Sequence, residues 1–69
     1  MQVEELKQVA ERQPFRPFGV RLVNGREYWF AQPRDLGATK DYGMIFFFGE
    51  RSAVRIDRDF IAEIMEELR

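Results

Sequence analysis

The chain has 69 residues, which is enough for one small domain, residues 1–69, with a single hydrophobic core. It contains no cysteine and no histidine, so disulfides, thiolate nucleophiles, histidine general bases and the commonest zinc ligands are all excluded. Eleven basic and twelve acidic residues leave a formal net charge of −1, which argues against a strong phosphate-binding surface.

Residues 1–13 are predicted to form an amphipathic helix. Val3, Leu6 and Val9 recur at helical spacing, and most of the positions between them are charged or carry amides. Pro14 ends the helix, because the residue before a proline is disfavoured in the helical region. A helix of about three turns is unstable alone, so its apolar side is expected to dock on a sheet.

Residues 18–31 are predicted to form a first β-hairpin. Asn24 and Gly25 supply the turn, since both residues tolerate positive φ. The strand before the turn has apolar residues at alternate positions, which are Phe18, Val20 and Leu22.

The register of this hairpin decides which side chains share a face. A bulged turn places Leu22 near Tyr28 and Val20 near Phe30, and this register is favoured because a slip by one residue would exchange the faces. Trp29 then faces outward, or contacts the helix or a neighbouring subunit.

Residues 32–42 are predicted to be a connector without regular structure. Pro33 ends the preceding strand, because proline cannot donate to the hydrogen-bond ladder. Leu36 is expected to pack at the edge of the core. As the longest irregular stretch, this connector is where a ligand-binding loop would be expected.

Residues 43–56 are predicted to form a second hairpin, with the apolar run Met44 to Phe48 as its first strand and residues 49–52 as its loop. Alternation places Ile45 and Phe47 on one face, and the other face then carries Met44, Phe46 and Phe48. A strand that is apolar on both faces is covered on both faces. We therefore expect either a closed barrel with the helix over it, or a contact between subunits.

Residues 57–69 have two interpretations. A turn at residues 57–59 followed by a strand from Phe60 to about Glu66 is one of them. The other is a helix that Asp57 would cap, with an apolar side made by Phe60, Ile61, Ile64, Met65 and Leu68. The strand is favoured by the resemblance that follows.

Residues 20–28 read Val-Arg-Leu-Val-Asn-Gly-Arg-Glu-Tyr, and this stretch resembles the pattern Val-x-Leu-x-Asn/Asp-Gly-Arg-x-Tyr/Phe of the Sm-like (Hfq-like) proteins. The resemblance implies a fold that is mainly β within the α+β class. A helix would precede a small, strongly bent antiparallel sheet or open barrel of four to five strands, Sm-like or SH3-like. The Pro-Phe-x-Pro-Phe motif at residues 14–18 is also similar to that of a group of short bacterial proteins, which implies the same small barrel.

The chain departs from the Sm-like pattern where that family contacts RNA. Phe30 stands where the family usually has a small residue, and residues 32–36 lack the Asp…Asn pair that holds a base. The Arg-Gly or Lys-His signature that the family carries late in its sequence is also missing at residues 56–59. The resemblance therefore implies the fold, and no RNA-contact residue is carried over.

Catalytic patterns are missing from the sequence. Ser52 is the single serine, and no histidine is present to activate it. The glycines are dispersed and form no phosphate-binding loop, while Asp57, Asp59 and Glu63 lack the ligand density of a calcium site. We expect no enzyme activity, no cofactor and no metal.

The predicted function is a non-catalytic protein-interaction module that binds a protein partner or another copy of itself. Apolar residues exceed what one small core can hide, so the candidate interaction surface consists of Trp29, Ile45, Phe47, Arg21 and Arg26. A small RNA-binding barrel is the alternative, because arginines interleave with Trp29 in this region. With no leader-like start, no long apolar run and no cysteine, a cytoplasmic location without membrane contact is expected.

Overall fold

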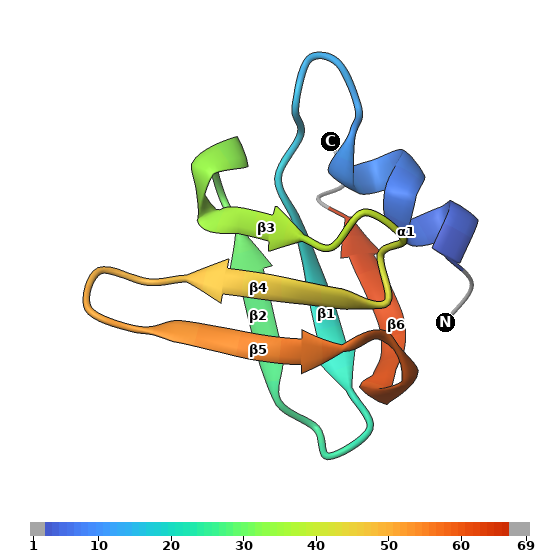
Figure 1. The fold of residues 1–69 in the computed structure, drawn as a ribbon, viewed down its shortest axis with the longest axis vertical. Helices are drawn as coiled ribbons and strands as arrows, with labels where there is room; N and C mark the ends of the chain where they lie inside the picture. The colour runs from blue at the N-terminus through green and yellow to red at the C-terminus, as the bar shows by residue number, and fades with distance from the viewer. Residues whose placement is uncertain (1–2, 67–69) are drawn as a thin grey trace.

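The structure is a computed structural model that describes residues 3–66, in which a helix is followed by six short strands (Figure 1). The elements are α1 (Val3–Ala10), β1 (Phe18–Leu22), β2 (Glu27–Phe30), β3 (Leu36–Ala38), β4 (Met44–Phe48), β5 (Ala53–Asp57) and β6 (Ile61–Glu66). Two single-turn 3₁₀ helices, η1 (Pro33–Asp35) and η2 (Arg58–Phe60), precede β3 and β6. The predicted order of helix, hairpin, hairpin and terminal strand is confirmed.

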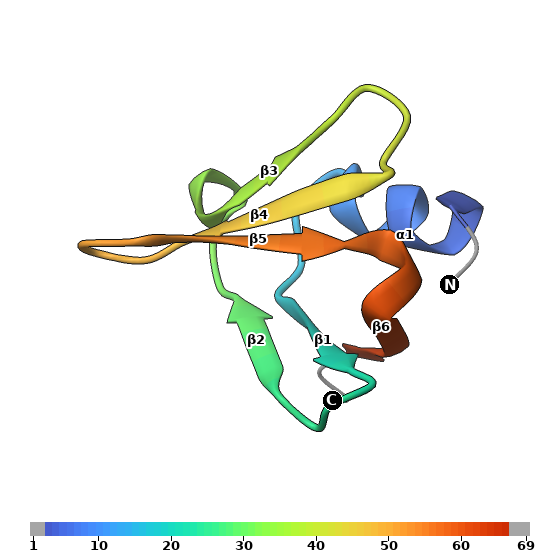
Figure 2. The ribbon, with the colours of Figure 1, turned by 60° about the horizontal axis from the view of Figure 1, so that its bottom comes forward.

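The strands form two antiparallel three-stranded sheets, ordered β2-β1-β6 and β3-β4-β5. In Figure 1 the strands of the front sheet run across those of the rear sheet, and in Figure 2 one sheet lies above the other with α1 at their side. The predicted α+β fold, with an N-terminal helix before antiparallel strands, is confirmed. The finer prediction of one bent sheet or open barrel with four to five strands differs from the structure, which has six strands in two sheets that do not close into a barrel. The chain changes sheets through η1 and η2, and these turns interrupt the ladders that a barrel would continue.

The first hairpin has a register two residues away from the predicted one, with the pairs Phe18–Phe30 and Val20–Tyr28. The amide of Gly25 donates to the carbonyl of Leu22 at 2.9 Å, and the amide of Leu22 donates to the carbonyl of Arg26 at 2.8 Å. Gly25 has a φ of 91°, as the last loop residue of such a turn requires. A shift by two preserves the faces, so the predicted grouping of side chains is retained while the partners differ.

The core lies between the inner faces of the two sheets and under α1. Its buried apolar side chains are Leu6, Val9, Phe18, Val20, Phe30, Ile45, Ile56 and Ile61. The helix contributes the first two, which confirms that it docks on the strands. Leu36 packs against this core from β3, as expected, although the connector was predicted to lack strands and contains both η1 and β3.

Strand β4 presents two different apolar faces, as its alternation predicted. Ile45 is fully buried, and the ring of Phe47 lies 5.5 Å from Tyr28 and 5.6 Å from Phe30, centroid to centroid. Phe46 and Phe48 stack on each other on the outer face, where Phe48 is 44% exposed. Among the described residues, the outer face of β4 is not buried by the rest of the chain. The expectation that a closed barrel would cover both faces of this strand is therefore wrong.

The last segment that the structure describes is a strand, β6, which decides between the two interpretations for residues 61–66. The carboxylate of Asp57 accepts a hydrogen bond from the amide of Asp59 at 2.9 Å and so caps η2. Strand β6 then pairs antiparallel with β1 up to Glu66. Residues 67–69, including the Leu68 of the helical interpretation, lie outside the described residues.

Candidate functional site

The five residues of the predicted interaction surface occupy different environments. Trp29 is 42% exposed on β2, and Arg26 is exposed in the hairpin turn. Arg21 forms an ion pair with Glu63 of β6. Phe47 faces the core, and Ile45 is fully buried, so its assignment to an interaction surface is wrong. The two sheets pack through the face of β4 that carries Ile45, which leaves the opposite face outside.

The outer face of β4 instead carries a row of three apolar side chains, Met44, Phe46 and Phe48. Phe60 borders a hollow together with Met44. Trp29 lies beside Gly19 on the outer face of the other sheet and borders another hollow together with Phe48. We call these five apolar side chains the apolar band. It includes three of the four large hydrophobic side chains that are exposed among residues 3–66: Trp29 at 42%, Phe48 at 44% and Phe60 at 58%.

Two glycines hold the aromatic rings at one end of the apolar band. A methyl group at Gly37 of β3 would lie 2.7 Å from Cε2 of Phe48. A methyl group at Gly19 of β1 would lie 2.5 Å from Cε3 of Trp29. Both distances are too short for a real contact, so each ring occupies the space that a side chain at the glycine would need. The absence of a side chain at these two positions allows both rings to pack against the backbone.

Charged side chains border both ends of the apolar band. The hollow next to Trp29 has a volume of about 500 Å³ and is also lined by Arg34, Asp35 and Glu50. The smaller hollow next to Phe60, about 270 Å³, is also lined by Arg55 and Asp57 of β5. A broad apolar surface with a charged margin is typical of a protein-binding surface.

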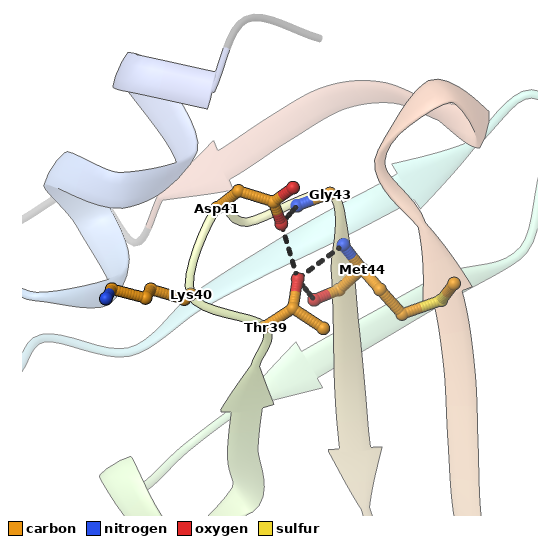
Figure 3. A pocket seen from close by; sticks show the side chains of 5 residues that line it. All are labelled: Thr39, Lys40, Asp41, Gly43 and Met44. Carbon is orange, nitrogen blue, oxygen red and sulfur yellow. Dashed lines mark hydrogen bonds between the residues drawn. The ribbon is translucent and has the colours of Figure 1, made fainter.

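A third hollow, of about 680 Å³, lies at the loop between β3 and β4 (Figure 3). One carboxylate oxygen of Asp41 accepts hydrogen bonds from the amide of Gly43 and from the hydroxyl of Thr39, both at 2.9 Å. The amide of Met44 donates to the Thr39 hydroxyl at 3.2 Å. The hydrogen bond from the Gly43 amide and the hydrogen bond from the Thr39 hydroxyl hold the pKa of Asp41 below its ordinary value. Because these groups bind one another, they stabilise the loop and offer little to a ligand.

The same loop is attached to α1 through a tyrosine. The hydroxyl of Tyr42 donates to a carboxylate oxygen of Glu11 at 2.8 Å. The backbone of Tyr42 has a φ of 57°, which is unusual for a residue other than glycine. The contact with Glu11 therefore stabilises a loop conformation that the backbone alone disfavours.

This contact leads to a test at alkaline pH. Burial, the Glu11 hydrogen bond and the Glu11 charge raise the pKa of Tyr42 from 10.0 to about 12. Since the folded state binds the phenolic proton more tightly, this stabilisation is complete below pH 10 and is lost as the pH rises through about 12. We expect the stability difference between the wild type and Tyr42→Phe to shrink over that interval in denaturant titrations. Ionisation of Tyr42 near pH 10, identified as the change in absorbance that Tyr42→Phe removes, would contradict the assignment.

Two arginines form ion pairs with glutamates of β6. Nη1 of Arg12 lies 2.6 Å from a carboxylate oxygen of Glu66, and Arg21 pairs with Glu63.

Within the part of the chain that the structure describes, no group of three or more acidic residues could hold a metal ion. No helix there is long and apolar enough to cross a membrane.

No family model, curated protein or solved structure matches this chain. The comparisons therefore identify no family, and the resemblance to the Sm-like proteins stays a prediction. The functional assignment depends on the geometry of the apolar band.

The sequence did carry a signal for the outward face of β4. In the strand that returns beside it, Val54 and Ile56 alternate with Ala53, Arg55 and Asp57. The structure pairs Val54 with Phe47 and Ile56 with Ile45, so the apolar positions of β5 mark the inner face of β4. The polar and small positions pair with Met44, Phe46 and Phe48 and mark the outer face.

Proposed function

We propose that this chain is a non-catalytic protein-interaction module that binds its partner through the apolar band. The observation that carries this proposal is the outer face of β4, where Met44, Phe46 and Phe48 lie in a row and share hollows with exposed Phe60 and Trp29. Exposed apolar residues scattered singly are ordinary, but a group of neighbouring ones with charged margins marks an interaction surface.

The shape of the apolar band favours a protein over a small molecule. A small-molecule site is usually concave, with a few polar groups that converge on the ligand. Here the broad surface of a sheet is apolar, and the polar loop from Thr39 to Met44 uses its hydrogen-bonding groups internally. A second protein surface with its own apolar side chains fits this arrangement best.

The charge of the chain makes RNA a less favoured partner than a protein. Arg12 and Arg21 are paired with glutamates, and the net charge of the chain is −1. Protein that binds RNA through phosphates loses affinity steeply as salt rises. We expect no binding to unstructured RNA at low salt, and submicromolar binding that weakens steeply with salt would overturn the proposal.

A capture experiment tests the apolar band directly. Immobilised wild-type protein is compared with the double variant Phe48→Ser, Phe60→Ser and with the single variant Arg26→Ser in an extract of the source cell. Arg26→Ser is at an exposed position and is expected to change stability by about 0.5 kcal/mol or less. The double variant loses the partial packing of two half-exposed rings and is expected to cost about 1–3 kcal/mol and to stay folded. We expect the double variant to lose the proteins that the wild type retains, and Arg26→Ser to retain them.

The Arg26→Ser control separates the two candidate surfaces, because Arg26 belongs to the surface predicted from sequence and lies outside the apolar band. Thermal unfolding by circular dichroism first establishes that each variant is folded. Equal retention by the wild type and the double variant would refute binding through the apolar band. Loss of retention in Arg26→Ser alone would instead support the surface predicted from sequence.

A further inference from the structure

We propose that the occupant of the apolar band is a second copy of this chain, bound face to face about a two-fold axis. The inference rests on the proposed function, because it requires the apolar band to be a protein-binding surface. It follows from the order of charges and apolar groups along β4 and β5.

The charges on this face of β5 have opposite signs and lie two residues apart. Arg55 pairs across the sheet with Phe46, and Asp57 pairs with Met44. Arg55 and Asp57 border the same hollow beside Phe60. Among the described residues, the ion pairs within 4 Å are Arg12–Glu66 and Arg21–Glu63, so neither Arg55 nor Asp57 forms an ion pair there. Asp57 accepts a hydrogen bond from the amide of Asp59 and keeps its charge.

A two-fold axis that runs across the strands at the level of Ile56 makes this pattern complementary to itself. Rotation about it reverses the strand direction, so Arg55 faces the partner's Asp57 and Asp57 faces the partner's Arg55. Two ion pairs form from one cation and one anion per chain. In an isologous contact of this kind, each surface patch meets its own copy.

The apolar side chains match about the same axis. Because residues on a strand rise by about 3.3 Å each, Phe46 and Met44 lie at equal distances on either side of the level of Ile45, which pairs with Ile56. Phe46 therefore meets the partner's Met44. Phe48 lies further along one side, and Phe60 borders the hollow beside Met44 on the other, so the rotation brings Phe48 towards the partner's Phe60.

The size of this face suits a dimer. A standard protein interface buries about 800 Å² per partner. This is a modest share of the 5134 Å² that the chain exposes, so one side of the molecule is large enough to supply it. Two chains with a net charge of −1 each repel only weakly, and a chain of 69 residues gains stability from association. A contact between subunits would also cover the second apolar face of β4.

Charge exchange between two variants tests the pairing. In a dimer of the Arg55→Glu variant, a glutamate faces the partner's aspartate at both pairs. In a dimer of the Asp57→Lys variant, an arginine faces the partner's lysine at both pairs. We expect each variant alone to dimerise at least about tenfold more weakly than the wild type, because attraction becomes repulsion at both pairs. An equimolar mixture of the two variants restores opposite charges at both positions and is expected to form a heterodimer. The single chain with both substitutions restores them as well.

Sedimentation velocity over a range of concentrations measures the mass, which is 8.3 kDa for one chain and twice that for the dimer. Since Asp57 caps η2, circular dichroism first checks that Asp57→Lys is folded; if it is not, the comparison of Arg55→Glu with the wild type carries the test. A wild type that stays at one chain, or a mixture that stays monomeric, would overturn the inference. If the wild type is monomeric but captures proteins through the apolar band, the proposed function stands and only the dimer is refuted. If the wild type neither dimerises nor captures proteins through the apolar band, both proposals are refuted.

Discussion

Replacing Phe47 with Asp is expected to unfold the chain. The Phe47 ring contacts Tyr28 and Phe30 on the inner side of β4, and Phe30 is fully buried. Phe47 is half-buried against the core, so removing its ring costs a large part of the about 3–5 kcal/mol of a buried phenylalanine, and the carboxylate adds the cost of placing a charge beside apolar side chains. Native domains are stable by about 5–15 kcal/mol, with small ones near the lower end, so little or no folded protein should remain.

The matched control is Phe48→Asp, one position along the same strand. Phe48 is on the outer face and 44% exposed, so its carboxylate stays in water and the domain is expected to fold. Circular dichroism and urea titration compare the two variants. A folded Phe47→Asp variant would show that Phe47 lies outside the core, and unfolding of Phe48→Asp would show that the two faces are exchanged.

Shortening Leu6 to Ala is expected to lower the free energy of unfolding by about 2–5 kcal/mol. Leu6 is fully buried, although it lies on a short helix that would be unstable alone. Its side chain joins α1 to the core, and its loss leaves a cavity between the helix and the sheets. Gln8→Ala is the control, because Gln8 is exposed on the same helix. Equal stability of Leu6→Ala and the wild type in urea would refute docking of α1.

The elements of the fold could largely be predicted from local patterns. Helical spacing of Val3, Leu6 and Val9 predicted α1, and the alternation in Met44 to Phe48 predicted β4. The Asn24-Gly25 turn predicted the first hairpin. In each case the signal lies within a few residues, so no knowledge of the tertiary structure was needed.

The register and the arrangement of the sheets depended on distant contacts. Asn24-Gly25 is compatible with several turns, and pairing of β1 with β6 on its other side helps to fix the one observed. Strand β3 was missed because Leu36-Gly37-Ala38 is short and contains glycine, so its local propensity for a strand is weak. It forms because β4 offers a free edge for pairing.

The candidate site was predicted only in part. Trp29 was identified and lies at one end of the apolar band, but Ile45 and Phe47 were assigned to the surface although both face the core. A strand that is apolar on both faces does not itself indicate which face is buried. The pattern of β5 indicates it, and using that pattern requires the register of the hairpin.

Hydroxyl-radical footprinting at rising protein concentration tests the account most directly, because it measures the reactivity of each side chain. In dilute solution, Phe48 and Phe60 should be modified quickly, while Phe30 and Phe47 should be protected. As the concentration rises, Phe48 and Phe60 should become protected together, because a second copy covers them. Phe47 reacting as fast as Phe48 in dilute solution, or Phe48 and Phe60 reacting equally at every concentration, would contradict the account.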